Sequence, residues 1–249
     1  MIKISAVSYL NTFPFIFGIE NSAFLKNFSV EKDVPAICAQ KLMDDKVDVG
    51  LVPVAVIPLI KAAEIITDYC IGATGKVKTV LLLSNQPLNN ISKIYLDPES
   101  RTSVQLVKVL AQKYWKINPL WEKSDSRFKH NLNNDEAVVL IGDKTFTATD
   151  KYPYVFDLAE EWFNFTKLPF VFACWVANKK LTENFISDFN KTLKFGVEHI
   201  EETVTYFKEF IPDSVDATDY FINNISYRLD DNKRKGMDLF FEYLNELKY

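Results

Sequence analysis

The sequence predicts a two-lobed α/β protein with parallel-rich sheets, in which one lobe is inserted into the other. Strand-like runs alternate with helix-like segments along most of the 249 residues, a pattern typical of βαβ units. The strands are near-continuous runs of valine, isoleucine and leucine, as expected where both faces of a sheet are covered. Two such runs, 79–84 and 170–177, bracket a middle third that itself alternates between strand and helix. We therefore expect these two runs to be crossover strands between the lobes.

The lobe boundaries follow from these two strands. We expect a discontinuous first lobe of residues 1–83 and 175–249, and an inserted second lobe of residues 84–174. The chain contains no internal repeat, low-complexity segment or glycine- and serine-rich linker that would suggest another division. Two lobes joined in this way predict a ligand-binding cleft between them.

The first third of the chain contains three of the expected strands, at residues 3–7, 28–31 and 47–52. A helix over 34–45 has apolar residues at Ile37, Leu42 and Met43, and Asp33 is its expected N-cap. A second helix over 54–61 follows Pro53, a residue suited to a first helical turn.

The rest of the chain repeats the alternation. Strands are expected at 78–84, 94–96, 137–141 and 170–177, and helices at 100–115 and 158–166. Apolar residues recur at helical spacing through 100–115, which favours a helix there. From residue 181 onward the pattern is helical, and a last helix runs from about 232 to 247.

Composition and charge exclude several classes of protein. Apolar residues make up 48% of the chain, and the net charge of −4 comes without any block of lysine and arginine. Nucleic acids and anionic membranes need clustered cations, so we expect neither as a partner, and nothing implies an obligate protein partner. The N-terminus lacks the continuous apolar run and cleavage site of a signal peptide, which favours a cytoplasmic protein.

Motifs for metals and cofactors are missing from the sequence. Cys38, Cys70 and Cys174 lie far apart and match no metal-binding spacing, which favours three buried, reduced thiols. No glycine-rich dinucleotide or phosphate-binding motif occurs among the seven glycines. We therefore expect neither a metal nor a cofactor.

Polar residues follow nearly every expected strand. In open α/β sheets, ligands bind beyond the carboxyl ends of the strands. We therefore expect a shared binding site formed by the residues at those ends, which include Ser8, Tyr9 and Asn11, then Ser84, then Arg101, Thr102 and Ser103, and finally Gly142 and Asp143.

The segment ESRTSV, residues 99–104, places three hydroxyl groups and an arginine at the start of a helix. Free backbone N–H groups and the helix dipole favour an anion at such a point. The alternative is that Ser100 is a simple N-cap, which would explain one of the hydroxyls. We favour an anion site in which Thr102 and Ser103 donate hydroxyls, with Arg101 either joining them or pointing to solvent.

The two histidines do not support nucleophilic catalysis. A Ser-His-Asp arrangement would need His130 or His199 at a strand end, and neither is there. His199 lies on the long C-terminal helical segment, where an exposed or half-buried structural role explains it. Asp143 is the acid found at a strand end, so it is the candidate general base.

Several segments together resemble one enzyme family. These segments span nearly the whole chain and are SYLNTFP (8–14), VDVGLVPV (47–54), VKTVLLLS (77–84), DPESRTSVQLVKVL (97–110), VLIGDKTF (139–146), DLAEEW (157–162) and LPFVFACWVA (168–177). In this order and spacing they are similar to the chorismate dehydratases of the futalosine route to menaquinone. Lys167 departs from the pattern, because a glycine is expected before Leu168-Pro169.

The resemblance implies a fold and a reaction. The fold is that of the periplasmic binding proteins (type II), with two α/β lobes closing on a ligand. The reaction is the loss of water from chorismate, a dicarboxylate, to give 3-[(1-carboxyvinyl)oxy]benzoate, which makes the protein a carbon–oxygen lyase. No cofactor is implied. A solute-binding protein of the same fold and a 1,4-dihydroxy-6-naphthoate synthase-like enzyme of the same pathway are the alternatives.

For this substrate we expect each polar turn to take a separate role. Thr102 and Ser103, with their backbone N–H groups, bind one carboxylate, and Ser84 binds the same carboxylate or the other. Asn11 contacts the reacting ring or the departing hydroxyl, and Tyr9 shapes the pocket wall. Ser8, Arg101 and Gly142 complete the expected substrate contacts. The proton removed from C3 of the substrate goes either to the enolpyruvyl carboxylate of the substrate itself or to Asp143.

Overall fold

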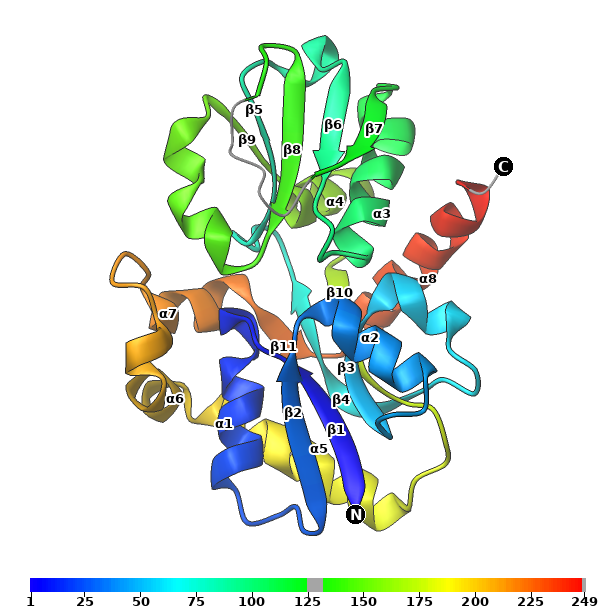
Figure 1. The fold of residues 1–249 in the computed structure, drawn as a ribbon, viewed down its shortest axis with the longest axis vertical. Helices are drawn as coiled ribbons and strands as arrows, with labels where there is room; N and C mark the ends of the chain where they lie inside the picture. Colours follow the sequence, from blue (N-terminus) through cyan, green and yellow to red (C-terminus); the bar gives the residue numbers. More distant parts are fainter. Residues whose placement is uncertain (125–131, 248–249) are drawn as a thin grey trace. The chain divides into compact units, whose positions relative to one another are not determined.

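The computed structural model describes residues 1–124 and 132–247 and divides into two compact units (Figure 1). Unit 1 is Met1–Gly72 with Val171–Asp231, and unit 2 is Ala73–Phe170 with Asn232–Tyr249. The division falls after Gly72 and Phe170, whereas the expected boundaries lay at 83 and 174. The last helix, expected in the first lobe, groups with unit 2.

Unit 1 is built on a six-stranded mixed sheet with the strand order β11-β4-β10-β3-β1-β2. Strand β1 is parallel to both β2 and β3, while β10 is antiparallel to β3 and β11 to β4. The bounds of the strands are β1 Ile2–Val7, β2 Phe28–Asp33, β3 Val49–Pro53, β4 Glu64–Ala73, β10 Phe170–Ala177 and β11 Ser226–Arg228. Its α-helices are α1 Phe13–Asn21, α2 Pro35–Met43, α5 Glu183–Glu198, α6 Ile200–Tyr206 and α7 Ala217–Asp219.

Two of the expected helices in this unit differ in detail. Asp33 is the last residue of β2 and not a cap; Val34 is the N-cap of α2, and its side chain makes no capping hydrogen bond. The segment expected to be a helix over 54–61 is a 3-10 helix, Val54–Leu59. Pro58 lies inside it and has no N–H to donate, which is incompatible with a regular α-helix there.

Helix α1 packs against α5 with their backbones nearly in contact. A Cβ atom added to Gly196 would lie 1.8 Å from the carbonyl oxygen of Pro14, and one added to Gly18 would lie 2.2 Å from that of Thr192. Both helices therefore need glycine at the crossing, because a backbone carbonyl cannot move aside as a flexible side chain can. This contact holds the start of α1, and with it the turn that follows β1.

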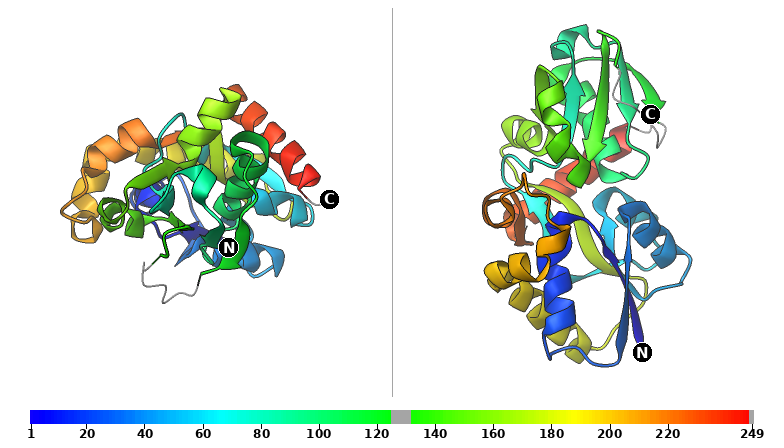
Figure 2. Two further views of the ribbon diagram at one scale, coloured as in Figure 1. Left: turned by 90° about the horizontal axis from the view of Figure 1, so that it is seen from above. Right: turned by 60° about the vertical axis from the view of Figure 1, so that its left-hand side comes forward.

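Unit 2 is built on a five-stranded mixed sheet with the order β7-β6-β8-β5-β9, seen from two further sides in Figure 2. Strand β6 is parallel to β7 and β8, and β5 is antiparallel to β8 and β9. The bounds are β5 Val80–Ser84, β6 Lys93–Leu96, β7 Leu120–Lys123, β8 Glu136–Ile141, β9 Tyr154–Asp157, α3 Thr102–Val109, α4 Leu158–Thr166 and α8 Asp231–Glu246.

The strand expected to be the first crossover, 79–84, is β5 and lies inside the sheet of unit 2. The chain instead enters unit 2 at the end of β4, a strand that we did not predict. Helix α3 is shorter than the expected 100–115 and continues as a π-helix, Leu110–Trp115. The C-terminal region also contains a strand, β11, that interrupts the expected run of helices.

Aromatic rings join α4 and α8 in the core of unit 2. The indole of Trp162, which is fully buried, packs edge-on against Phe170 and Phe240. A Cβ added to Gly236 of α8 would lie 2.3 Å from the carbonyl oxygen of Pro169, so this helix also docks backbone to backbone. These contacts explain why α8 belongs to unit 2.

The carboxylate of Asp157 fixes where α4 begins. Its Oδ1 accepts hydrogen bonds from the N–H groups of Ala159 and Glu160, and its Oδ2 accepts from those of Val77 and Lys78. One side chain thus caps the helix and holds the turn that leads into β5. In the described part of the chain, no helix is both long and apolar enough to cross a membrane.

We expect Gly196→Ala to destabilise unit 1 by roughly 1–3 kcal/mol, because the new methyl group overlaps the Pro14 carbonyl. Urea unfolding followed by circular dichroism measures the change. Lys194→Ala is the matched control, because Lys194 is exposed on the same helix. An unchanged unfolding midpoint for Gly196→Ala would contradict the close approach.

Lys167→Gly should stabilise the protein by about 0.5–1 kcal/mol, because Lys167 ends α4 in the left-handed region with φ of 61°. Lys167→Ala keeps the Cβ and removes the rest of the side chain, so it should bring no such gain. Thermal unfolding of the two variants separates the backbone effect from the loss of charge, and equal melting temperatures would show that the conformation is not strained.

Candidate functional site

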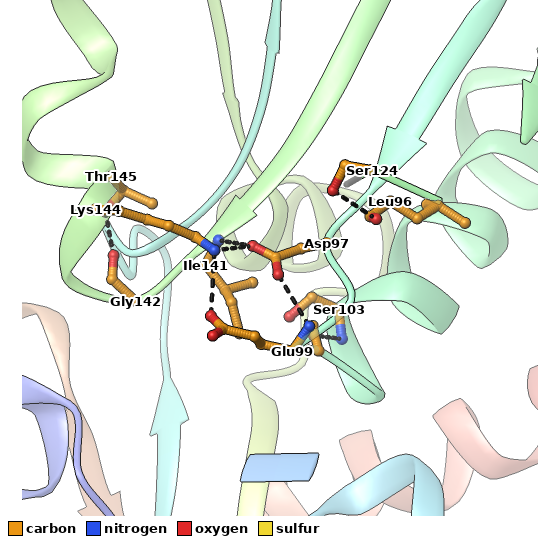
Figure 3. Close-up of polar contacts among 10 residues, drawn as sticks. Leu96, Asp97, Glu99, Ser103, Ser124, Ile141, Gly142, Lys144 and Thr145 are labelled. Atoms are coloured by element: carbon orange, nitrogen blue, oxygen red, sulfur yellow. Dashed lines mark hydrogen bonds and ion pairs between the residues drawn. The ribbon is translucent and has the colours of Figure 1, made fainter. Parts of the chain in front are cut away.

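The carboxyl ends of β6 and β8 meet at one edge of the sheet of unit 2, because these strands are parallel neighbours. The chain leaves β6 through Asp97 and enters α3, and it leaves β8 through Gly142 and enters a 3-10 helix, Asp143–Thr147. Figure 3 shows some of the residues there, among them Asp97, Glu99 and Lys144. We call this group of residues (Asp97, Glu99–Ser103 and Gly142–Thr145) the polar edge.

Asp97 is the centre of the polar edge. Its side chain is 1% exposed, and its Oδ2 lies 2.6 Å from Lys144 Nζ. The same oxygen accepts a hydrogen bond from the N–H of Ile141, at 3.3 Å, while Oδ1 accepts from that of Glu99, at 3.0 Å. The carboxylate therefore ties the end of β8 to the turn after β6 (Figure 3). It was missed as a candidate, although it follows its strand directly.

Lys144 balances the charge of Asp97. Its Nζ also lies 3.3 Å from Glu99 Oε2. Burial alone would lower the pKa of the Lys144 ammonium, but its hydrogen bond to Asp97, with the charges of Asp97 and Glu99, outweighs burial and raises the pKa. The two side chains thus form a charged pair that fixes the loop containing Asp143.

One of the backbone N–H groups at the start of α3 is already bonded to a serine side chain. Ser100 Oγ accepts the N–H of Ser103 at 3.0 Å, so the simple N-cap alternative describes Ser100, and the Ser103 N–H is not available to an anion. Thr102 and Ser103 are buried, while Arg101 is exposed. Thr102 and Ser103 therefore lie buried in the first turn of α3, a few residues after Asp97, whereas Arg101 lies at the surface.

Gly142 acts through its backbone. Its φ of 71° lies in the region that favours glycine, and this turns the chain sharply from β8 into the 3-10 helix. Its N–H donates to the Thr79 carbonyl, and its own carbonyl accepts from the Thr145 hydroxyl, at 2.9 Å in both cases. Gly142 thus sets the position of Asp143, which is half-buried.

Ser84 lies at the opposite edge of the sheet. Because β5 is antiparallel to β8, Val80 pairs with Ile141 and Ser84 pairs with Ala137. Ser84 Oγ donates to the carbonyl of Glu136 and accepts the N–H of Gln86, so both of its roles are filled by the backbone. The structure does not bring Ser84 together with Thr102 and Ser103.

In unit 1, the turn after β1 contains Ser8, Tyr9 and Asn11. Thr12 closes this turn, since its Oγ1 donates to the carbonyls of Val7, at 2.5 Å, and Tyr9, at 2.7 Å. Ser8 is exposed, and its N–H and hydroxyl both donate to the Asp33 carbonyl at the end of β2. The parallel pairing of β1 and β2 thus places this turn beside the end of β2.

Asn11 is held in a 3-10 turn, Leu10–Thr12, and is half-buried. Its Oδ1 is buried and accepts no hydrogen bond from the described residues. Its carbonyl oxygen accepts the hydroxyl of Tyr227 on β11, at 3.0 Å. A buried amide oxygen without a donor is costly unless a ligand or water supplies one, which makes Asn11 the most distinctive polar group of the turn.

His199 has a structural role, as expected. It is half-buried at the end of α5, its Nδ1 lies 2.7 Å from the carbonyl oxygen of Phe195, and its ring stacks on that of Phe195. The other histidine, His130, lies outside the described residues.

Comparison with known proteins assigns the chain to a family. A family model described as menaquinone biosynthesis matches residues 2–246. The chain belongs to the menaquinone biosynthesis family. The expected resemblance is thereby confirmed at the level of the family. A curated relative, the chorismate dehydratase of Thermus thermophilus, is 25% identical in an alignment of 242 positions, and the match covers 88% of this chain and 88% of that one.

The protein has the fold of the periplasmic binding proteins. The protein AF1704 from Archaeoglobus fulgidus superposes with a TM-score of 0.72 at 14% identity, over 99% of this chain and 97% of that one. A Candida albicans protein, CA3427, described as having the generic periplasmic binding protein fold, superposes with a TM-score of 0.60 at 11% identity, over 100% and 91%. At such low sequence identity, these superpositions show the fold alone. They confirm the predicted fold class.

We expect Asp97→Asn to lower the free energy of unfolding by about 2–3 kcal/mol, because the buried group loses its charge and Lys144 loses its partner. Because Lys144 is partly exposed, this loss of unfolding free energy is at the low end of the range for a buried ion pair. Thermal and urea unfolding at pH 7 measure the loss, and Glu99→Gln, at the more exposed partner, should cost much less.

The pH dependence of this difference follows from the raised pKa of Lys144. Its ammonium stabilises the folded state fully below the ordinary lysine pKa of 10.5, and that contribution is lost as the pH rises through the higher folded value. Wild type and Asp97→Asn should therefore differ by the same amount from pH 7 to about pH 10, and converge above it. A difference that vanishes well below pH 10 would contradict the pair.

Proposed function

We propose that the protein catalyses the dehydration of chorismate to 3-[(1-carboxyvinyl)oxy]benzoate, as a hydro-lyase of menaquinone biosynthesis. Membership of the menaquinone biosynthesis family and the similarity to the Thermus thermophilus chorismate dehydratase support this proposal. The structural observation that carries it is the Asn11 carboxamide, in the turn that resembles the dehydratases, whose buried oxygen accepts no hydrogen bond from residues 1–124 or 132–247. A cytoplasmic location and the absence of a cofactor stay predictions.

The reaction is a 1,2-elimination on the cyclohexadiene ring. The C3–H bond breaks, its proton goes to the base and its electron pair forms the new ring double bond. The C4–O bond breaks, and the base passes the proton to the departing hydroxide, which becomes water. Aromatisation supplies the driving force. The protein has to hold two carboxylates, orient the ring and stabilise the departing hydroxyl, tasks that neutral hydrogen-bonding groups can perform.

We assign Asn11 to the departing hydroxyl and Thr102 and Ser103 to one carboxylate. Ser8 and Tyr9 line the substrate beside Asn11, and Arg101 supplies positive charge from the surface. We leave Ser84 out of the proposal, because its hydroxyl is engaged by the backbone at the far edge of its sheet. Gly142 serves by shaping the loop of Asp143, since its own N–H is bonded to Thr79.

The proton has two candidate acceptors. The enolpyruvyl carboxylate of chorismate can reach the C3 hydrogen through a six-membered arrangement, which is an intramolecular and therefore entropically favoured transfer. Asp143, half-buried at the start of its 3-10 helix, is the rival base. We favour the substrate carboxylate, with the protein supplying position and hydrogen-bond donors.

Incubation of the purified protein with chorismate should give the enolpyruvyl benzoate, detected by chromatography and its aromatic absorbance. Asn11→Ala should lower kcat by about 100-fold or more, in the range found for the loss of one transition-state hydrogen-bonding group. Asp143→Asn should keep kcat within about threefold of wild type, because the substrate carboxylate and not Asp143 accepts the proton. If Asp143 were the general base, its loss would lower kcat by at least about 100-fold.

The outcomes separate the alternatives. A large loss in Asp143→Asn would assign the proton to that carboxylate, and full activity of Asn11→Ala would remove Asn11 from the mechanism. Chorismate that binds but is not converted by wild type would favour a solute-binding role. Turnover of the dihydroxynaphthoate synthase substrate in place of chorismate would favour the other enzyme of the pathway.

A further inference from the structure

We propose that Tyr227 is a positioning residue that aims the Asn11 carboxamide through a hydrogen bond to its backbone. The inference rests on the proposed role of Asn11 and adds to it a residue that no motif marked. Tyr227 lies 216 positions further along the chain, on β11 at the edge of the sheet of unit 1.

The first observation is the hydrogen bond itself. Tyr227 Oη donates to the carbonyl oxygen of Asn11 at 3.0 Å. Tyr227 is 5% exposed, and burial raises the pKa of its phenol well above the ordinary value, with a smaller contribution from Tyr220. The hydroxyl therefore keeps its proton and remains a donor throughout the pH range in which the protein would work.

The second observation is the local shape of β11. Ser226 pairs with Gly72 and Arg228 with Tyr69, and the register shifts between the two pairs. Irregularities of this kind re-aim a side chain out of the regular alternation of a strand. Tyr227 stands at this irregularity, and its ring packs edge-on against Phe15, at 5.2 Å between centroids. It thus contacts both the turn after β1 and the helix that follows.

The third observation is that the Asn11 carboxamide depends on its backbone for orientation. Its Oδ1 accepts no hydrogen bond from the described residues, so no donor among them holds that end of the amide. The backbone on one side is fixed by Thr12, whose hydroxyl binds the carbonyls of Val7 and Tyr9. Tyr227 fixes the Asn11 carbonyl itself. Loss of this bond would let the turn shift, and small misplacements of a catalytic group are costly.

Tyr227→Phe tests the proposal, because it removes the hydroxyl and keeps the ring. We expect kcat for chorismate to fall about tenfold with KM changed less than about twofold, as for a group that acts on geometry and not on substrate affinity. Tyr69→Phe is the matched control. Tyr69 is also buried and packs edge-on against Phe15, but no hydrogen bond joins its hydroxyl to Asn11 in the described part of the chain. It should keep kcat within about twofold of wild type.

A double variant shows whether Tyr227 acts through Asn11. In an Asn11→Ala background, Tyr227→Phe should lower kcat no further, because the group that it positions is gone. The same tenfold loss in both backgrounds would overturn the proposal, as would full activity of Tyr227→Phe or an equal loss in Tyr69→Phe.

A readout without chorismate keeps this inference separate from the proposed function. Tyr227→Phe should speed hydrogen exchange of the Thr12 amide, which donates to the Tyr9 carbonyl in the same turn, and Tyr69→Phe should not. If wild type does not convert chorismate, the proposed function fails, and the exchange rates still decide whether Tyr227 holds the turn. Unchanged exchange in Tyr227→Phe would overturn the positioning role itself.

Discussion

The direction of each strand decides which polar turns of this protein can act together. Side chains that follow parallel neighbouring strands meet at one edge of a sheet, and those that follow an antiparallel neighbour meet at the other. In unit 2 this places Asp97 beside the loop of Asp143 and sends Ser84 to the far side. In unit 1 it places the turn after β1 beside the end of β2. The polar edge exists because β6 and β8 run the same way.

The sequence was sufficient to predict the fold class and most of the strands, because buried strands are continuous apolar runs. The strand expected at 170–177 is β10 with the same bounds. Strands β7, β9 and β11 escaped prediction because they are short, at three or four residues, and because all three are edge strands with several exposed or half-buried side chains. The prediction of an α-helix after Pro53 was wrong, because a second proline, Pro58, cannot make the regular hydrogen bonds of an α-helix.

The candidate site was harder to predict, and the reason is physical. Grouping the polar residues that follow each strand assumes that all strands are parallel. That assumption placed Ser84 with Thr102, although the antiparallel pairing of β5 and β8 separates them. The position of an acid after a strand also did not single out Asp97. Its importance comes from three hydrogen-bond donors, which β8, the turn after β6 and the 3-10 helix after β8 bring to it. The contact of Tyr227 with Asn11 has no local signature, because it joins residues 216 positions apart.

Because Gly236 and Phe240 dock α8 onto unit 2, the two units become able to fold at different times during synthesis. Domains fold as units while the ribosome delivers the chain from its N-terminus. Unit 1 has all of its residues once Asp231 has emerged, whereas unit 2 still lacks α8 at that moment. Residues 73–170 therefore lack one covering of the Trp162 and Phe170 rings until α8, which is synthesised after the residues of unit 1, reaches them. The unit that contains the polar edge is the last to become complete.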